Sequence, residues 1–292
     1  MVTDDRSRLS GSDAGQMVLC LITNDVEFAR DAEAAGIDRI MVDLEVHGKV
    51  ERQAGQGLFL SQHQPEDVRH LKGCLRTAAV MVRVNPLHAG TKHEIDDVLH
   101  DGADVVMLPM VQAPSEVVEF IQVVQGRATT SLLLETKASV RQIEQIVQID
   151  GIDEIHVGLN DLRISLGLRL PFDVLRSGLL DTLSATIRGA GIRFGFGGIA
   201  RLTATDLPVA PERVLAEQVR LGAATGLLGR SFRQGLERQR RPGELADEVR
   251  RIRAAIDRWS RASSRQRTRN RERLLREIAA WRKKLAVPAV AQ

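Results

Sequence analysis

The chain has 292 residues, of which 43% are hydrophobic and 27% charged, with a formal net charge of +3. This composition excludes collagen-like repeats, wholesale disorder and a protein with many membrane spans. At about 150 residues per domain the length suits two domains, but one α/β barrel uses the same length. The charge is unevenly placed: residues 233–284 hold 18 Lys/Arg and 7 Asp/Glu, a local +11, whereas the first 232 residues carry −8. An acidic body is therefore followed by a basic tail.

The cysteines and the N-terminal segment bear on the cellular compartment. Cys20 and Cys74 lie in apolar runs without the pair spacing of a metal site, which disfavours a disulfide framework and a zinc ribbon. Residues 1–16 are polar, lack the apolar stretch of a signal peptide and are expected to be disordered. No uncharged apolar run approaches the roughly 18 residues of a membrane span. We therefore expect a cytoplasmic protein with no membrane partner.

From residue 17 onward one pattern recurs: a short apolar run rich in β-branched residues, a turn, and a segment with helical spacing. Helix signals mark residues 25–35, which end at Gly36, 91–100, and 115–124, which follow Pro114. Eight runs have the character of strands: 18–23, 39–45, 79–85, 104–110, 130–136, 154–160, 192–198 and 226–232. The dinucleotide fingerprint of a doubly wound sheet does not follow the first run. We predict a (β/α)8 TIM barrel over residues 17–238.

Residues 239–292 are predicted to form a basic helical extension. Apolar side chains recur there at helical spacing and indicate two amphipathic helices: Ile252, Ile256 and Trp259, then Leu274, Leu275, Ile278, Trp281 and Leu285. The arginine-rich run 261–273 would suit a nucleic-acid-binding segment, but it lacks interleaved aromatic side chains. We expect instead that the extension contacts the acidic barrel of another subunit.

Polar residues cluster where the predicted strands end, which is the side of an α/β barrel that carries active sites. Glu135 and Asp161 close neighbouring strands, which lie about 4.8 Å apart. Two such carboxylates either share a proton or share a hard divalent cation such as Mg²⁺ or Mn²⁺. The alternative is that Asp161 caps the next helix and Glu135 pairs with a basic side chain.

Arg83 lies in a buried-strand context, so its guanidinium needs an anion. That anion is either a structural carboxylate such as Glu45 or a substrate carboxylate held bidentately. Asp43 and Glu45 are two residues apart, so they share a strand face and can reach the same pocket. Either could order the water molecules around a metal ion. Asn85, Gly158 and Asn160, at the ends of the third and sixth strands, complete the predicted substrate-binding set.

A histidine is the natural proton shuttle near neutral pH. Five histidines are candidates for this role: His47, His88, His93, His100 and His156. His47 follows the second strand on the catalytic side, His100 falls nearer the opposite end of the barrel, and His156 is expected in the core. Lys137 is expected to be solvated rather than a Schiff-base nucleophile. The loops after the last two strands offer an anion or phosphate site, formed by Gly197, Gly198, Arg230 and Ser231.

Six short motifs, in order and at consistent intervals, carry a resemblance to a known family: 41–45 (MVDLE), 82–86 (VRVNP), 102–110 (GADVVMLPM), 134–136 (LET), 158–162 (GLNDL) and 165–167 (SLG). Over roughly residues 17–232 the chain resembles the HpcH/HpaI aldolase family, neighbour to the citrate lyase β-subunit family within the phosphoenolpyruvate/pyruvate superfamily.

The resemblance implies a class II aldolase or lyase that forms or breaks a C–C bond between the enolate of pyruvate, or a related 2-oxo acid, and an aldehyde. The loops after the last two strands indicate an aldehyde that is sugar-like or phosphorylated. The resemblance assigns Glu135 and Asp161 as ligands of Mg²⁺ or Mn²⁺, with Co²⁺ as a further candidate, and Arg83 as the residue that grips the substrate carboxylate. It also implies a homo-oligomer, a trimer or a hexamer.

One departure concerns the catalytic base. Typical members have a histidine at the position of Val46 and an aspartate at that of His100, and here His47 and Asp101 stand one residue away. Either His47 supplies the base from a shifted turn, or a metal-bound hydroxide does, or the chemistry differs; Asp43 and Glu45 complete the predicted catalytic set with Arg83 and His47. Two alternative functions are a citrate lyase-like enzyme acting on an acyl-CoA and a nucleic-acid-binding protein that uses the basic tail, of which the latter is the less expected.

Overall fold

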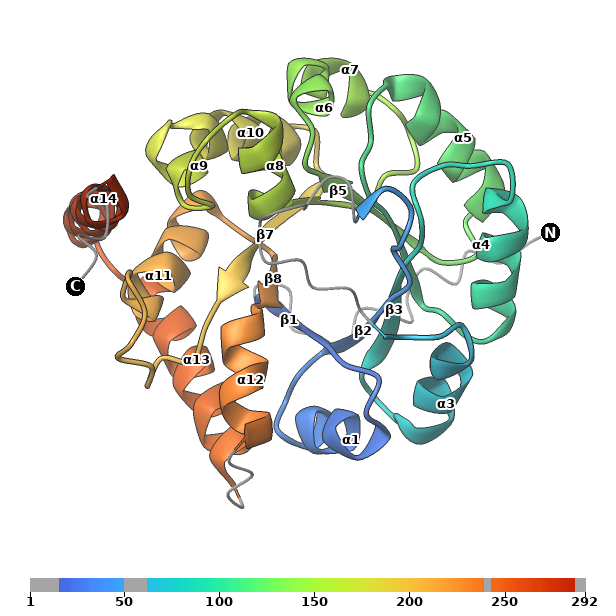
Figure 1. Cartoon of the computed structure of the whole chain (residues 1–292), viewed down its shortest axis with the longest axis horizontal. Coiled ribbons are helices and arrows are strands. Elements are labelled where there is room, and N and C mark those ends of the chain that lie inside the picture. Colours follow the sequence, from blue (N-terminus) through green and yellow to red (C-terminus); the bar gives the residue numbers. More distant parts are fainter. Residues whose placement is uncertain (1–15, 50–61, 239–242, 287–292) are drawn as a thin grey trace, which may run out of the picture.

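Eight parallel strands close into a barrel in the computed structural model, which describes residues 16–49, 62–238 and 243–286 (Figure 1). The strands pair in chain order, and β1 returns to pair with β8. They are β1 (Val18–Ile22), β2 (Arg39–Asp43), β3 (Ala79–Arg83), β4 (Val105–Leu108), β5 (Thr129–Leu134), β6 (Glu154–Val157), β7 (Arg193–Ile199) and β8 (Thr225–Leu228). The (β/α)8 prediction is confirmed, while the predicted disordered segment lies, except for Gln16, outside the described residues.

Helices follow the strands and cover the outside of the barrel (Figure 1). Those of the barrel are α1 (Val26–Ala34), α3 (Glu66–Cys74), α4 (Thr91–His100), α5 (Pro114–Val124), α6 (Lys137–Arg141), α7 (Ile143–Ile146), α8 (Leu159–Ser165), α9 (Asp173–Arg176), α10 (Leu179–Gly189), α11 (Pro211–Leu221) and α12 (Arg230–Arg238). The N-terminal signals act as expected, because the Asp25 carboxylate accepts the Phe28 N–H at the start of α1 and Pro114 opens α5.

The predicted strands run too far at their carboxyl ends. The run 226–232 is strand only to Leu228, since Gly229 donates its N–H to the Ile199 carbonyl and α12 begins at Arg230. Likewise β2 ends at Asp43 and β5 at Leu134, so that Glu45 and Glu135 stand in the loops above the barrel. An apolar run does not by itself show where a strand gives way to a loop or helix.

The barrel interior is filled in layers. A small apolar cluster of alternate strand residues occupies the middle, formed by Cys20, Met41, Met81, Val105, Met107 and Leu133. At the N-terminal ends of the strands, Arg39 donates to both oxygens of Glu154 at 2.7 and 2.9 Å, and His156 Nε2 lies 2.7 Å from Thr225 Oγ1. His156 is therefore a core histidine, as predicted, and burial lowers its pKa to about 4. These side chains fill the barrel at the N-terminal ends of its strands.

The two helices predicted for the basic tail are confirmed as α13 (Glu244–Ser260) and α14 (Ser264–Ala286), both packed against α11 (Figure 1). Arg253 of α13 donates to the Met17 and Gly36 carbonyls and to Asp38. Arg271 of α14 pairs with Asp181 at 2.7 Å and with Glu217 at 2.6 Å. Part of the basic tail thus neutralises acidic groups of its own barrel, and its contact with another subunit stays a prediction. Within the described ranges no helix is both long and apolar enough to cross a bilayer.

Candidate active site

Asp43 and Arg83 end adjacent strands and are register partners. Arg83 Nε donates to Asp43 Oδ1 at 2.8 Å and Nη2 donates to Oδ2 at 2.7 Å, which is a bidentate pair. Its Nη1 is 3.5 Å from Glu45 Oε2. Although burial opposes it, the charge of Arg83 holds the pKa of Asp43 well below its usual range. The structural carboxylate that satisfies Arg83 is therefore mainly Asp43, with Glu45 in second place.

Lys49 is a member of this cluster that the sequence analysis missed. Its side chain is only 5% exposed, and its Nζ lies 3.1 Å from Asp43 Oδ2 and 3.5 Å from Glu45 Oε2. The available signal was the spacing of four residues between Glu45 and Lys49, but nothing in the sequence showed that the turn after β2 folds inward. Lys49 and Arg83 together hold Asp43, which ends β2, and Glu45, in the loop that follows it.

Glu135 is as buried as Glu45, with 2% of its surface exposed. Burial, followed by the negative charges of Glu45 and Asp161, raises its pKa well above the usual range, and Arg83 only partly offsets this. The Met110 N–H donates to Glu135 Oε1 at 3.2 Å. Met110 adopts φ 57°, a left-handed conformation that costs a non-glycine residue about 1–2 kcal/mol. Glu135 therefore lies within electrostatic range of both Glu45 and Asp161.

Asp161 lies in the first turn of α8, but the N-cap of that helix is Gly158. The capping role considered for Asp161 is therefore wrong, and its carboxylate interacts with Glu135 instead. Gly158 leaves room for the Glu135 side chain, because a Cβ at this position would stand 2.5 Å from Glu135 Oε2. Glu135 and Asp161 thus interact electrostatically, and their role as metal ligands stays a prediction.

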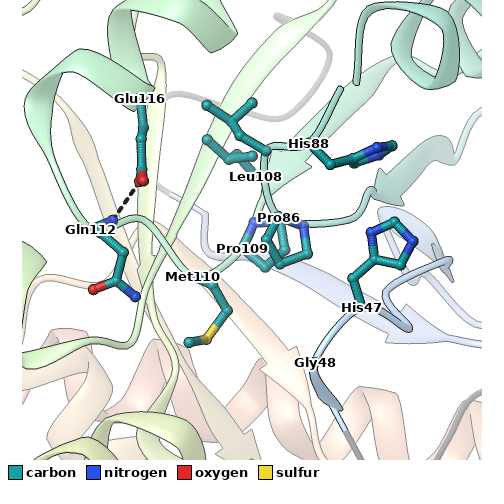
Figure 2. A pocket seen from close by; sticks show the side chains of 10 residues that line it. His47, Gly48, Pro86, His88, Leu108, Pro109, Met110, Gln112 and Glu116 are labelled. Atoms are coloured by element: carbon teal, nitrogen blue, oxygen red, sulfur yellow. Dashed lines mark hydrogen bonds between the residues drawn. The ribbon is translucent and has the colours of Figure 1, made fainter. Parts of the chain in front are cut away.

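A cavity of about 390 Å³ opens beside this cluster, between the loops that follow β2, β3 and β4 (Figure 2). Met110 lines it and also holds Glu135, which connects the cavity to the carboxylates. The lining residues are His47, Gly48, Pro86, Leu87, His88, Leu108, Pro109, Met110, Gln112 and Glu116. The imidazoles of His47 and His88 meet edge to face, with ring centroids 4.7 Å apart (Figure 2).

The remaining histidines lie elsewhere. His93 is on the outer surface of α4, with Nε2 3.5 Å from Asp97 Oδ2, and His100 ends the same helix. Of the five candidates, only His47 and His88 therefore line the cavity. Lys137 is exposed at the start of α6, as expected.

The predicted substrate-binding amides are both engaged within the chain. Asn85 Oδ1 accepts the N–H groups of Val46 and His47, while its Nδ2 donates to Glu94. Asn160 Oδ1 accepts from Arg163 Nε at 3.2 Å. Asn85 thus fixes the turn that carries His47, a role that no local sequence pattern indicated.

The predicted anion site occupies the ends of β7 and β8. Gly197 and Gly198 are the last residues of β7 before Ile199, and Gly198 has φ 103°, which favours glycine. Arg230 and Ser231 form the first turn of α12 and are exposed. The structure brings the two loops together through the Gly229–Ile199 hydrogen bond, and anion binding there stays a prediction.

Three solved structures with similar folds place the barrel among known proteins. An HpcH/HpaI aldolase from Desulfitobacterium hafniense DCB-2 is 19% identical at a TM-score of 0.57, over 74% of this chain and 87% of that one. The citrate synthase SbnG is 20% identical at 0.57, over 77% and 90%. A citrate lyase beta subunit from M. tuberculosis, complexed with oxaloacetate and magnesium, is 18% identical at 0.57, over 82% and 96%. No curated protein sequence matches the chain significantly.

A family model gives the more decisive comparison. The model described as HpcH/HpaI aldolase/citrate lyase matches residues 16–173, which are more than half of the chain and include Asp43, Arg83, Glu135 and Asp161. The members that this description names make or break carbon–carbon bonds, which supports a C–C lyase. By this match, the protein belongs to the HpcH/HpaI aldolase/citrate lyase family.

Proposed function

We propose that the protein is a divalent-metal-dependent lyase of the class II aldolase type. It would join or split the enolate of pyruvate, or of a related 2-oxo acid, and an aldehyde. Family membership supports the C–C lyase activity in general. The metal dependence and the substrate class rest on the charges and the shape of the barrel mouth.

The observation that carries the proposal is an excess of negative charge at this mouth. Four carboxylates, Asp43, Glu45, Glu135 and Asp161, interact with two cationic side chains, Arg83 and Lys49. When ionised, these six groups alone sum to a charge of −2, and burial makes unbalanced charge costly in their surroundings. Burial, and after it the negative charges of Glu45 and Asp161, raises the pKa of Glu135 well above its usual range. One divalent cation would balance the excess negative charge.

The donor atoms suit a hard cation. Carboxylate oxygens are the ligands that Mg²⁺ and Mn²⁺ prefer, and Glu135 and Asp161 would hold the ion. Among the described residues no three His, Cys, Asp or Glu side chains are placed to enclose a metal ion. The site therefore suits an ion that takes its other ligands from the substrate and water. Such an ion would supply Lewis acidity toward the keto and carboxylate oxygens of a 2-oxo acid and so acidify its methyl group.

The chain's own residues would bind and orient the 2-oxo acid. Asp43 fixes two of the three guanidinium nitrogens of Arg83, so Nη1, which lies 3.5 Å from Glu45 Oε2, is the atom that would bind a substrate carboxylate. Glu45 partly balances the positive charges of Lys49 and Arg83. His47, at the cavity wall, is our proposed base for a methyl proton.

The cavity beside the carboxylates would take the aldehyde. Among the residues that the structure describes, its lining combines apolar side chains, such as Leu87 and Met110, with His47, His88 and Gln112, and holds no Lys or Arg. Such a surface favours an uncharged acceptor with hydroxyl groups, a sugar-like aldehyde, over a phosphorylated one or the phosphates of an acyl-CoA. The citrate lyase-like alternative is accordingly the second choice.

The decisive experiment follows deuterium exchange into the methyl group of pyruvate by NMR, with no aldehyde present. Mg²⁺ or Mn²⁺ should be required, and Glu135→Gln or Asp161→Asn should lower the exchange rate by about 10²-fold or more. Glu119→Gln, on the exposed side of α5, is the matched control and should have no effect.

The same preparation distinguishes the competing mechanisms. Borohydride with pyruvate should leave the activity intact, since no lysine Schiff base is proposed. Absence of exchange with every divalent metal would refute the proposal. Cleavage of a 3-hydroxyacyl-CoA in place of pyruvate exchange would instead favour the acyl-CoA lyase.

A further inference from the structure

Glu94 of α4 lies outside the carboxylate cluster and hydrogen-bonds to the loop that follows β3. Its Oε1 accepts the backbone N–H of Asn85 at 3.1 Å and the Asn85 Nδ2 at 2.8 Å. Its Oε2 lies 3.0 Å from His88 Nε2. Both oxygens are therefore engaged by residues of the loop after β3, and only 16% of the side chain is exposed.

One branch of this array reaches the backbone of His47. Asn85 Oδ1 accepts the N–H groups of Val46 at 2.9 Å and of His47 at 3.0 Å. The Asn85 amide can hydrogen-bond to Glu94 and to the turn at the same time in one orientation only, with its NH₂ group toward Glu94 and its oxygen toward the turn. The Glu94 carboxylate thus fixes the orientation of the amide, and the amide fixes the turn. Val46 is 50% exposed, so packing of that side chain contributes little to holding the turn.

The other branch reaches the ring of His47. His88 Nδ1 accepts the Gly90 N–H at 3.0 Å, so the ring proton of neutral His88 must be on Nε2, where it is donated to Glu94. With both nitrogens engaged, the His88 ring is held in place. It meets the His47 ring edge to face, at a centroid distance of 4.7 Å and an interplanar angle of 78°. The two branches converge on one residue, His47.

We propose that Glu94 is the positioning residue for His47, acting on its backbone through Asn85 and on its ring through His88. The proposal rests on the proposed function, in which His47 removes a proton from the methyl group of the 2-oxo acid. His88 has no nitrogen left for substrate, so it supports the base rather than replacing it. The array sets where the His47 imidazole stands at the wall of the cavity.

The substitution Glu94→Gln separates the two branches. The glutamine oxygen is kept next to Asn85, which donates two hydrogen bonds there, so the new NH₂ group faces the N–H of His88 Nε2. Two donors then oppose each other and the His88 branch is lost, while the Asn85 branch is kept. Asp97→Asn is the matched control, because Asp97 pairs with His93 on the same helix but away from the cavity.

Two measurements test the proposal. The first is pyruvate methyl exchange with Mn²⁺: Glu94→Gln should lower kcat by about 10- to 100-fold at an unchanged KM, as expected for a misplaced base. In the His47→Gln background it should cause no further loss, whereas Asp97→Asn should behave as wild type. An additional loss in the double variant equal to that in the single one would overturn the proposal, since Glu94 would then act independently of His47.

The second measurement is imidazole NMR of the metal-free protein, which does not require activity. Glu94→Gln should shift the resonances of both His88 and His47, and Asp97→Asn only those of His93. Unchanged His47 resonances in Glu94→Gln would refute the positioning role. If the wild type shows no pyruvate exchange, the proposed function fails, and the NMR result alone decides whether Glu94 positions His47. Should Glu94→Gln fail to fold, His88→Phe, which keeps a ring beside His47 but removes the hydrogen bonds, replaces it in both measurements.

Discussion

Replacing Gly158 with alanine tests the geometry of the carboxylate pair by adding one methyl group. The new Cβ would stand 2.5 Å from Glu135 Oε2 and 2.9 Å from Glu135 Cβ, well inside the roughly 3.5 Å of an ordinary contact. The backbone of Gly158 has φ −83°, which alanine adopts freely, so the whole effect is steric. Glu135 is buried and held by the Met110 N–H, and it must move by about 1 Å.

A displacement of this size should be more costly for function than for folding. We expect pyruvate exchange to fall by about 10²-fold, Mn²⁺ affinity, measured by electron paramagnetic resonance, to fall by about 10-fold or more, and the free energy of unfolding to fall by about 1–3 kcal/mol. Gly73→Ala is the control, because a Cβ at Gly73, within α3, meets nothing within 4 Å. A Gly158→Ala protein with wild-type metal affinity and exchange rate would refute the assignment of Glu135 as a ligand.

Three further predictions follow from buried groups and from the tail. The pKa of His156 is lowered to about 4, so the unfolded chain binds its proton first as the pH falls; stability should be full above pH 6.5 and decline by about 3 kcal/mol between pH 6.5 and 4. Urea titrations should show a smaller decline in His156→Gln, and equal curves would contradict the assignment. Arg83→Lys loses the bidentate pair with Asp43 and should raise KM for pyruvate by about 10-fold; an unchanged KM would mean that Arg83 is structural only. Ending the chain at residue 238 removes α13, α14 and the hydrogen bonds of Arg253 to Met17 and Gly36. This truncation should lower Tm by about 10 °C or more. Light scattering of the truncated protein tests the predicted oligomer contact.

Local signals were sufficient where local interactions decide the structure. The helix 91–100 was predicted to the residue, since Gly90 precedes it and Gly102, at φ 100°, follows its end. The carboxyl ends of the strands were predicted less well, because Glu45 and Glu135 leave the sheet for reasons of tertiary packing. The choice of His156 as a core histidine succeeded because its mid-strand position implied burial.

Several contacts of the site could not be predicted from the sequence. Arg83 was known to need an anion, but only the register of β2 and β3 decides that Asp43, rather than Glu45, is the main partner. Lys49 and Glu94 belong to no recognisable sequence motif. The turn after β2 brings Lys49 to the barrel mouth, and α4 brings Glu94 there. Interactions between residues far apart in the chain are set by the closed barrel and cannot be inferred from spacing alone.

Closure of the barrel has a consequence for synthesis on the ribosome. Val18 of β1 pairs with Thr225 of β8, and Arg253, further along the chain, hydrogen-bonds to Met17. The partner of the first strand emerges about 207 residues later, which takes about 10–40 s at ordinary translation rates. During that time one edge of β1 is an unpaired, apolar strand edge, of the kind that recruits other chains. A lower growth temperature, or a chaperone that covers this edge, should therefore raise the yield of folded protein more than substitutions that stabilise the native state would.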